Sequence, residues 1–225
     1  MTIDFNMVKR LTLKDWQIHQ KVIAGYVAGG ILGLAIFGMP HAYTFYMGAV
    51  IMLTVTIASG FHAVSVTIIN EKKEQTLPFI MSLPIRPIEY ALAKFFANFT
   101  IFIVPWLMMM MGLIFIALFG PIPNGMLPFL VLVGTLVVAN YCIVLSVTMM
   151  TESEGWSIFT MVLVNLLLNP VIMLMTSNPD FYSHFKEETM VWPAIASQIL
   201  LAQLAVAVIS IALVLYHQAR RLTFI

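Results

Sequence analysis

Charged residues gather in one stretch of this chain, between Asn70 and Lys94. Its ionisable residues are Glu71, Lys72, Lys73, Glu74, Arg86, Glu89 and Lys94. Its centre is apolar instead and contains Leu77, Phe79, Ile80, Met81 and Leu83. Charges around large apolar side chains are typical of a helix that lies on a lipid surface or fits the groove of a partner protein. The alternative is a tight turn between two long helices.

The long apolar stretches on either side hold few polar residues, and almost all of these are uncharged. They are Ser59, His62, Asn140, Asn165, Asn169, Gln198 and Gln203, with Lys94 as the one charged exception. Such residues either line a substrate path or form hydrogen bonds between membrane helices, and the second role is the more common one. The path candidates are Ser59, His62, Asn165 and Asn169. A proton-coupled transporter usually needs an ionisable group inside the membrane, so the pattern argues against that class.

The sequence lacks the short motifs of several enzyme classes. There is no Gly-rich phosphate loop followed by Lys-Ser or Lys-Thr, no HExxH, no CxxC and no GxSxG. The one cysteine, Cys142, forms neither an internal disulfide nor a metal cluster by itself. Four consecutive methionines, Met108 to Met111, point in different directions around a helix, so at most one or two could line any path. No catalytic residue, metal or bound cofactor is therefore expected in this chain.

Composition predicts an all-α integral membrane protein. Hydrophobic residues make up 61% of the 225 residues and charged residues 9%, and the mean hydropathy is +0.97. Soluble domains carry about a quarter charged residues. A single membrane domain is expected, because no hydrophilic stretch is long enough for a soluble one. The predicted spans are residues 22–39, 42–69, 88–119, 127–150, 156–176 and 193–216. The third is expected to be interrupted at Pro105.

The first 21 residues have moderate amphipathic character and predict a helix in the membrane interface that leads into the first span. Asp15 and its neighbour Lys14 interrupt the apolar side of that helix. In the first span, Gly25, Gly29 and Gly33 recur at every fourth residue. This pattern lets membrane helices approach closely, so we expect that face to pack on another helix.

Basic residues predict the orientation. With six spans and an internal amino terminus, ten of the eleven Lys and Arg residues face the cytoplasm and only Lys186 lies outside. This is the positive-inside pattern, and it puts both termini in the cytoplasm. The formal net charge of +1 gives no support to a nucleic-acid partner, and none is expected.

One part of the charged stretch resembles a known family. Glu71, Glu74, Thr76, Leu77, Ser82, Leu83, Pro84, Arg86, Glu89 and Lys94 are similar to the cytoplasmic loop after the second span of type-2 ATP-binding cassette (ABC) transporter permeases. That loop commonly reads E-x-x-T-L-x-x-L-x-x-x-P and is followed by a helix with an acid and a Gly-Lys pair. Here Ala93 replaces the glycine, and Pro78 comes early. The six-span layout, with an interfacial first helix and a polar stretch before the sixth span, is also similar.

The resemblance implies the permease half of an exporter in a plasma membrane, such as a bacterial inner membrane. A separate ATPase subunit would bind ATP and Mg²⁺, and two permease copies would enclose the path in the lipid bilayer. The coupling helix would lie between spans 2 and 3. The implied ATPase contacts are Glu71, Glu74, Thr76, Leu77, Phe79 and Ile80 in this loop, with Glu152 and Glu154 in a second turn.

A rival interpretation is an ATP-independent membrane enzyme or assembly factor, for which polar groups should cluster at one membrane face. The candidates there are His41, Asp180, His184 and Glu187. A channel would normally show a repeated selectivity element, which the sequence lacks. Apolar spans with uncharged polar groups favour an amphipathic cargo over a small, multiply charged ion.

Overall fold

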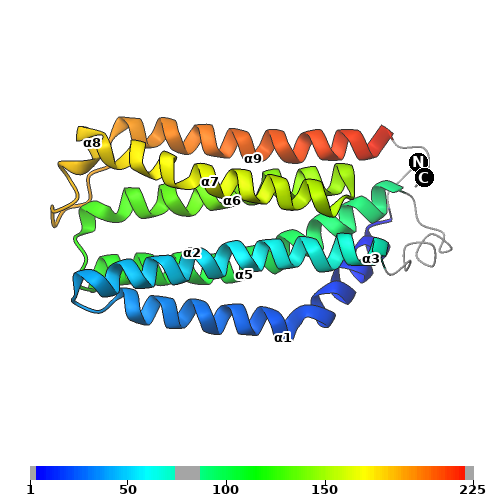
Figure 1. Ribbon diagram of the computed structural model, residues 1–225, viewed down its shortest axis with the longest axis horizontal. Coiled ribbons are helices and arrows are strands. Elements are labelled where there is room, and N and C mark those ends of the chain that lie inside the picture. Colours follow the sequence, from blue (N-terminus) through cyan, green and yellow to red (C-terminus); the bar gives the residue numbers. More distant parts are fainter. Residues whose placement is uncertain (1–3, 74–86, 221–225) are drawn as a thin grey trace.

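The computed structural model describes residues 4–73 and 87–220, and regular structure in these residues is helical throughout. Six helices are long and apolar enough to cross a membrane, which is the arrangement of a multi-pass membrane protein. They lie side by side as an elongated bundle (Figure 1). The long helices are α1 (Phe5–Phe37), α2 (Ala42–Val64), α5 (Pro87–Phe119), α6 (Leu127–Thr151), α7 (Glu154–Ser177) and α9 (Ala194–Arg220).

Short elements complete these helices. A π-helix, Ser65–Ile69, and the four-residue α3, Asn70–Lys73, continue α2 without a break. A 3₁₀ turn, Asn124–Met126, precedes α6, and α8, Pro179–Tyr182, lies between α7 and α9. The predicted count of six spans is confirmed.

The amino-terminal segment and the first span form one continuous helix. Asp4 caps α1, because its side chain accepts hydrogen bonds from the backbone N–H groups of Asn6 and Met7. The first turns lie at an angle to the rest of α1 (Figure 1). A separate helix over residues 1–21 is therefore not seen, and the place of these turns in a membrane interface stays a prediction.

Proline does not interrupt the helices, so the predicted break at Pro105 is wrong. Pro105 lies inside α5, is almost fully buried, and the helix continues to Phe119. Pro170 is likewise inside α7. Membrane helices tolerate such prolines because neighbouring helices and local adjustments satisfy the freed backbone groups.

Packing divides the bundle into two groups that meet at the centre. α1 packs mainly on α2 and α5, whereas α6 packs on α7 and α9. A Cβ at Gly33 would come within 2.8 Å of Met52 on α2, and one at Gly29 within 3.3 Å of Val55. Gly25 has nothing within 4 Å of its would-be Cβ. The predicted glycine face is therefore confirmed for two of its three positions.

The two ends of the bundle differ in what they hold. The first turn of α1, the end of α3, the start of α5, the α6–α7 turn and the last turn of α9 share one end, which we call the terminus end (Figure 1). The α1–α2 turn, the α5–α6 connection and α8 lie at the opposite end.

Candidate functional site

The four residues predicted to line a path do not converge in this structure. Ser59 is 1% exposed, and its hydroxyl donates to the backbone oxygen of Thr56. His62 is half-buried beside the rings of His19 and Tyr26, with centroids 6.3 and 5.9 Å away. Ser59 therefore bonds within α2, and His62 of α2 packs against α1.

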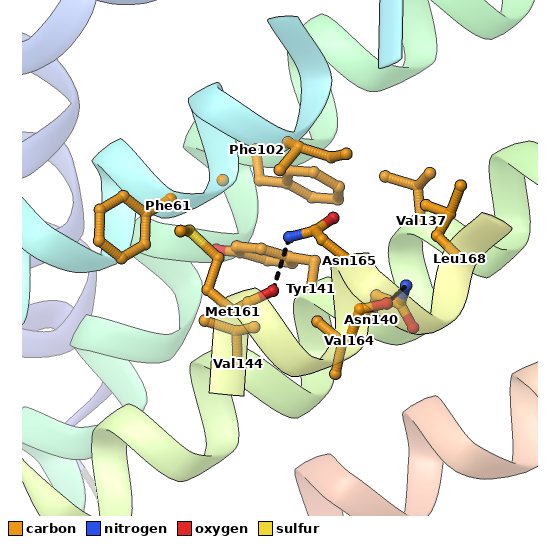
Figure 2. Close-up of a pocket in the computed structure, with 12 residues that line it drawn as sticks. Phe61, Phe102, Val137, Asn140, Tyr141, Val144, Met161, Val164, Asn165 and Leu168 are labelled. Carbon is orange, nitrogen blue, oxygen red and sulfur yellow. Dashed lines mark hydrogen bonds between the residues drawn. The ribbon is translucent and has the colours of Figure 1, made fainter. Parts of the chain in front are cut away.

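Asn165 of α7 is a path candidate that lines a cavity. The cavity, of about 30 Å³, lies between α2, α5, α6 and α7, and the stacked rings of Phe102 and Tyr141 form part of its lining (Figure 2). The amide nitrogen of Asn165 donates to the backbone oxygen of Met161 at 2.8 Å. A space of this size holds only a few water molecules, so it is too small for an amphipathic substrate in the present conformation.

Asn169 lies one turn further along α7, and its side chain is exposed. An exposed amide near the middle of a membrane-spanning helix would meet hydrocarbon, where an unsatisfied polar group costs several kcal/mol. A partner chain or a polar path beside Asn169 would remove this cost.

Other polar span residues bridge helices, as the more common interpretation predicted. The amide of Asn140 on α6 donates to the backbone oxygen of Val164 on α7 at 3.2 Å. The hydroxyl of Thr135 on α6 donates to the side-chain oxygen of Gln203 on α9. These contacts hold α6, α7 and α9 together.

A larger cavity of about 240 Å³ is almost wholly apolar and was not predicted. α2, α5 and α6 supply most of its lining, which includes Phe45, Met52, Trp106, Met109, Met110 and Val133. Of the four consecutive methionines, Met109 and Met110 line it, whereas Met111 is 64% exposed on another side of α5. Two of the four methionines therefore line this cavity, which agrees with their spacing around the helix.

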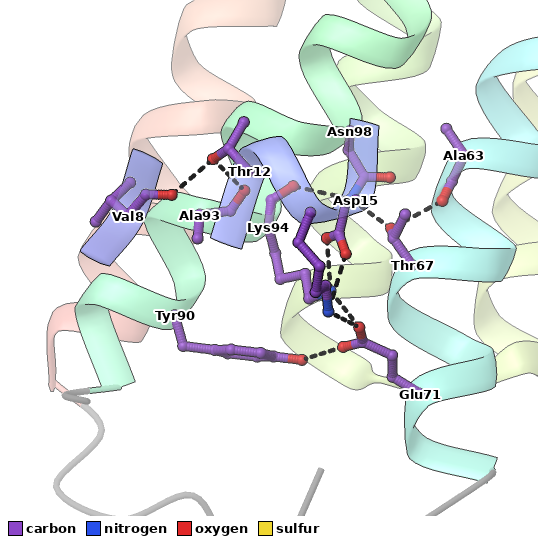
Figure 3. Close-up of polar contacts among 11 residues, drawn as sticks. Val8, Thr12, Asp15, Ala63, Thr67, Glu71, Tyr90, Ala93, Lys94 and Asn98 are labelled. Atoms are coloured by element: carbon purple, nitrogen blue, oxygen red, sulfur yellow. Dashed lines mark hydrogen bonds and ion pairs between the residues drawn. The ribbon is translucent and has the colours of Figure 1, made fainter. Parts of the chain in front are cut away.

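A buried ion cluster at the terminus end joins three helices that are far apart in the sequence. The ammonium of Lys94 on α5 lies 2.8 Å from a carboxylate oxygen of Asp15 on α1 and 2.6 Å from one of Glu71 on α3 (Figure 3). The side chains of Lys94 and Asp15 are each 5% exposed, and that of Glu71 is 15% exposed. Of the ion pairs between described residues, Lys94–Asp15 and Lys94–Glu71 are the most deeply buried.

Two further groups complete the cluster on its outer side. The ammonium of Lys14 lies 3.1 Å from Asp15 and 3.2 Å from Glu71, and the hydroxyl of Tyr90 donates to the second oxygen of Glu71 at 3.1 Å. Among the described residues, the cluster contains two lysines and two carboxylates, whose formal charges balance. Buried charges persist in a protein interior only when they are paired in this way.

A neutral hydrogen-bonded pair lies beside the ions. The amide of Asn98, which is fully buried, donates to the hydroxyl of Thr67 at 2.7 Å and to the backbone oxygen of Lys94 at 2.8 Å (Figure 3). Thr67 belongs to the π-helix, Ser65–Ile69, and its hydroxyl donates to the backbone oxygen of Ala63. A π-turn holds an extra residue and is frequent at functional sites. Here it changes the direction in which α3 presents Glu71.

Two half-exposed ion pairs lie next to this cluster and connect α3 to the α6–α7 turn. Lys72 pairs with Glu152 at 3.4 Å and Lys73 with Glu154 at 2.6 Å. Glu152 has a left-handed backbone, with a φ of 47°, and its N–H donates to the backbone oxygen of Thr148 as the cap of α6. The structure therefore brings together the start of the predicted coupling loop and the second predicted contact turn.

The remaining predicted contact residues, Glu74, Thr76, Leu77, Phe79 and Ile80, lie outside the described residues. Glu71 is described, and its carboxylate is bound within the chain by Lys94, Lys14 and Tyr90. Sequence reasoning assigned Glu71 to a partner surface and missed its pairing with Lys94 and Lys14, the two lysines that also contact Asp15. The sequence did contain one indication of this pairing. Asp15 interrupts the apolar side of one predicted helix, and Lys94 is a charged residue within another apolar stretch.

The chemistry of these groups is ionic and structural. Among the described residues, no three or more His, Cys, Asp or Glu side chains are placed to hold a metal ion. Comparison with protein-family models, with curated proteins and with solved structures finds no match for this chain.

Proposed function

We propose that this chain is the membrane-spanning permease subunit of an ABC exporter, driven by a separate ATPase subunit. One observation carries the proposal: at the terminus end, the residues that begin the resembling loop pair with the turn expected to be the second ATPase contact. Lys72 and Lys73 at the end of α3 pair with Glu152 and Glu154 at the α6–α7 turn. A single partner at that end could then contact both.

The helix arrangement supports the same assignment. Six spans place the first turn of α1 and the last turn of α9 at one end of the bundle (Figure 1). The basic residues described on α3, α5 and α9 are nearer to this end, as are those on α1 except Lys21, which lies at the middle of that helix. Lys186 lies between α8 and α9 near the opposite end. A cytoplasmic terminus end would satisfy the positive-inside rule.

The substrate path in this proposal lies between two copies of the chain. Asn169 is exposed on α7, and Asn165 lies one turn away at the small cavity. A second copy that covers this face would remove Asn169 from lipid and give it hydrogen-bonding partners. An amphipathic substrate suits a path with apolar walls and a few uncharged amides. Closure of the ATPases on ATP would shift the two copies between access states.

The proposal is tested by producing the chain together with a P-loop ATPase encoded beside it. The expected result is a stable complex whose Mg²⁺-dependent ATP hydrolysis is stimulated by the substrate. Leu77→Asp should abolish the complex while the chain still inserts in the membrane, because a charge would enter the apolar contact. Lys186→Met, near the opposite end, is the matched control.

Two results would contradict the proposal. In one, the purified chain performs its task with no ATPase present, which would favour the membrane enzyme or assembly factor. In the other, the Leu77→Asp variant retains full substrate-stimulated ATP hydrolysis with its partner. Residues 71–80 would then not be the ATPase contact.

A further inference from the structure

The buried ion cluster holds the two helices that flank residues 74–86. Glu71 is on α3, directly before this segment, and Lys94 and Tyr90 are on α5, directly after it. The contacts of 2.6 and 3.1 Å therefore tie the outgoing and incoming helices to each other. Neither helix can change its direction at this point without breaking a buried contact.

α1 is tied to the same place by several bonds. Asp15 binds Lys94, and Lys14 binds Glu71. One turn earlier, the hydroxyl of Thr12 is shared between the backbone oxygen of Val8 in its own helix, at 2.9 Å, and that of Ala93 on α5, at 3.3 Å. At the start of the helix, the backbone N–H of Asp4 donates to the carboxylate of Glu89 at 2.9 Å. The first half of α1 is thus attached to α5 along its length.

Burial gives this attachment a single preferred geometry. Charges that are 5% exposed have lost most of their hydration, and only short contacts to opposite charges compensate for that loss. A small separation of the helices would leave charges that neither water nor protein satisfies. The half-exposed pairs of Lys72 and Lys73 differ, since water can replace either partner there.

From this geometry we infer that Asp15, Glu71 and Lys94 are positioning residues that form one rigid joint between α1, α3 and α5. Movement of the helices that flank residues 74–86 is then passed to α1 as a unit. The source of that movement, a partner ATPase, rests on the proposed function; the joint itself rests only on the contacts described here.

The first experiment uses the whole chain in lipid nanodiscs, without any partner. The test variant is Asp15→Asn/Lys94→Met, which stays neutral because Lys14 and Glu71 can still pair. Amide hydrogen exchange in residues 5–15 should become faster by about tenfold or more, while exchange in α6 and α9 stays unchanged. Lys21→Met, an exposed position on α1, is the control. Unchanged exchange in residues 5–15 overturns the joint.

The second experiment measures the transported substrate per ATP hydrolysed by the complex. The same double variant should lose at least half of this ratio while it still hydrolyses ATP, because movement would no longer reach α1. A merely structural role would lower transport and ATP hydrolysis in parallel, which leaves their ratio unchanged. An unchanged ratio therefore overturns the inference.

A second neutral variant keeps both experiments decisive if the first does not fold. Lys14→Met/Glu71→Gln removes the other pair and leaves Asp15 with Lys94. Exchange should then increase in residues 70–73, and the transport ratio should fall; wild-type values for both overturn the joint. If the wild-type chain forms no ATPase complex at all, the proposed function fails, and the nanodisc experiment still decides the joint.

Discussion

Replacing Lys94 by methionine should destabilise this chain more than any other single loss of a charge in the described residues. The substitution keeps the apolar stem but leaves Asp15 and Glu71 without the ammonium that contacts both, at 2.8 and 2.6 Å. Of the two lysines in the cluster, only Lys14 would then pair with Asp15 and Glu71, and its side chain is 41% exposed. Breaking a buried pair in this way costs about 3–5 kcal/mol.

A second substitution should recover much of this loss. Asp15→Asn/Lys94→Met removes both members of the pair and leaves no uncompensated charge, so its cost should be at least about 2 kcal/mol smaller than that of Lys94→Met alone. Lys73→Met provides the matched control. Its contact with Glu154 is also 2.6 Å long, but the two side chains are 55% and 47% exposed, and its effect should stay within about 1 kcal/mol.

The assay is unfolding in mixed micelles, followed by tryptophan fluorescence. Trp16 packs in the small core of Ile23, Ala63 and Ile101 next to Asp15, so it reports on this region. The reasoning is refuted if Lys94→Met is no less stable than Lys73→Met. It is also refuted if the double variant is less stable than the single one.

Two further predictions concern packing and the path. Gly48→Ala should destabilise the chain by about 1–3 kcal/mol, because its Cβ would come within 2.5 Å of the backbone of Phe37. Gly25→Ala is the matched control in the same assay and should be neutral or slightly stabilising, since nothing lies within 4 Å of its Cβ. Asn169→Leu should leave the isolated chain as stable or more stable in lipid but reduce transport by the complex. A substitution that leaves the transport rate intact would remove Asn169 from the path.

Local patterns in the sequence were enough to predict the helices. The third span was expected at residues 88–119, and α5 is Pro87–Phe119; the fifth was expected at 156–176, and α7 is Glu154–Ser177. These limits follow from hydropathy and from turn residues such as Gly120 and Pro121, which act over short distances. The amino-terminal boundary was less clear because α1 runs through both the mixed segment and the apolar one without a breaking residue.

The ion cluster could not be predicted in the same way. Asp15 and Lys94 are 79 residues apart, and their contact depends on how α1 crosses α5. Glu71 faces them only after the π-turn at Ser65–Ile69, and no residue type in that stretch marks the extra residue. The resemblance of residues 71–94 to a contact loop implied that Glu71 contacts a partner ATPase. In the structure, its carboxylate binds Lys94, Lys14 and Tyr90 of the same chain. A motif of this kind predicts which segment matters but not which of its side chains support the fold.

Helix length explains how an otherwise uncharged set of spans can hold this cluster. At about 1.5 Å per residue, Asp15 lies roughly 33 Å from the Phe37 end of α1, and Lys94 lies roughly 37 Å from the Phe119 end of α5. A hydrocarbon layer is about 30 Å thick. A layer that begins at the opposite end of the bundle therefore stops just before Asp15 and Lys94. Lys21, roughly 24 Å from Phe37, would extend its long side chain toward the same boundary. Protein, rather than lipid, then buries the cluster, at a depth where water could reach the charges if the three helices moved apart. A joint at this depth can be rigid when closed, yet its opening avoids the much larger cost of exposing charge to hydrocarbon.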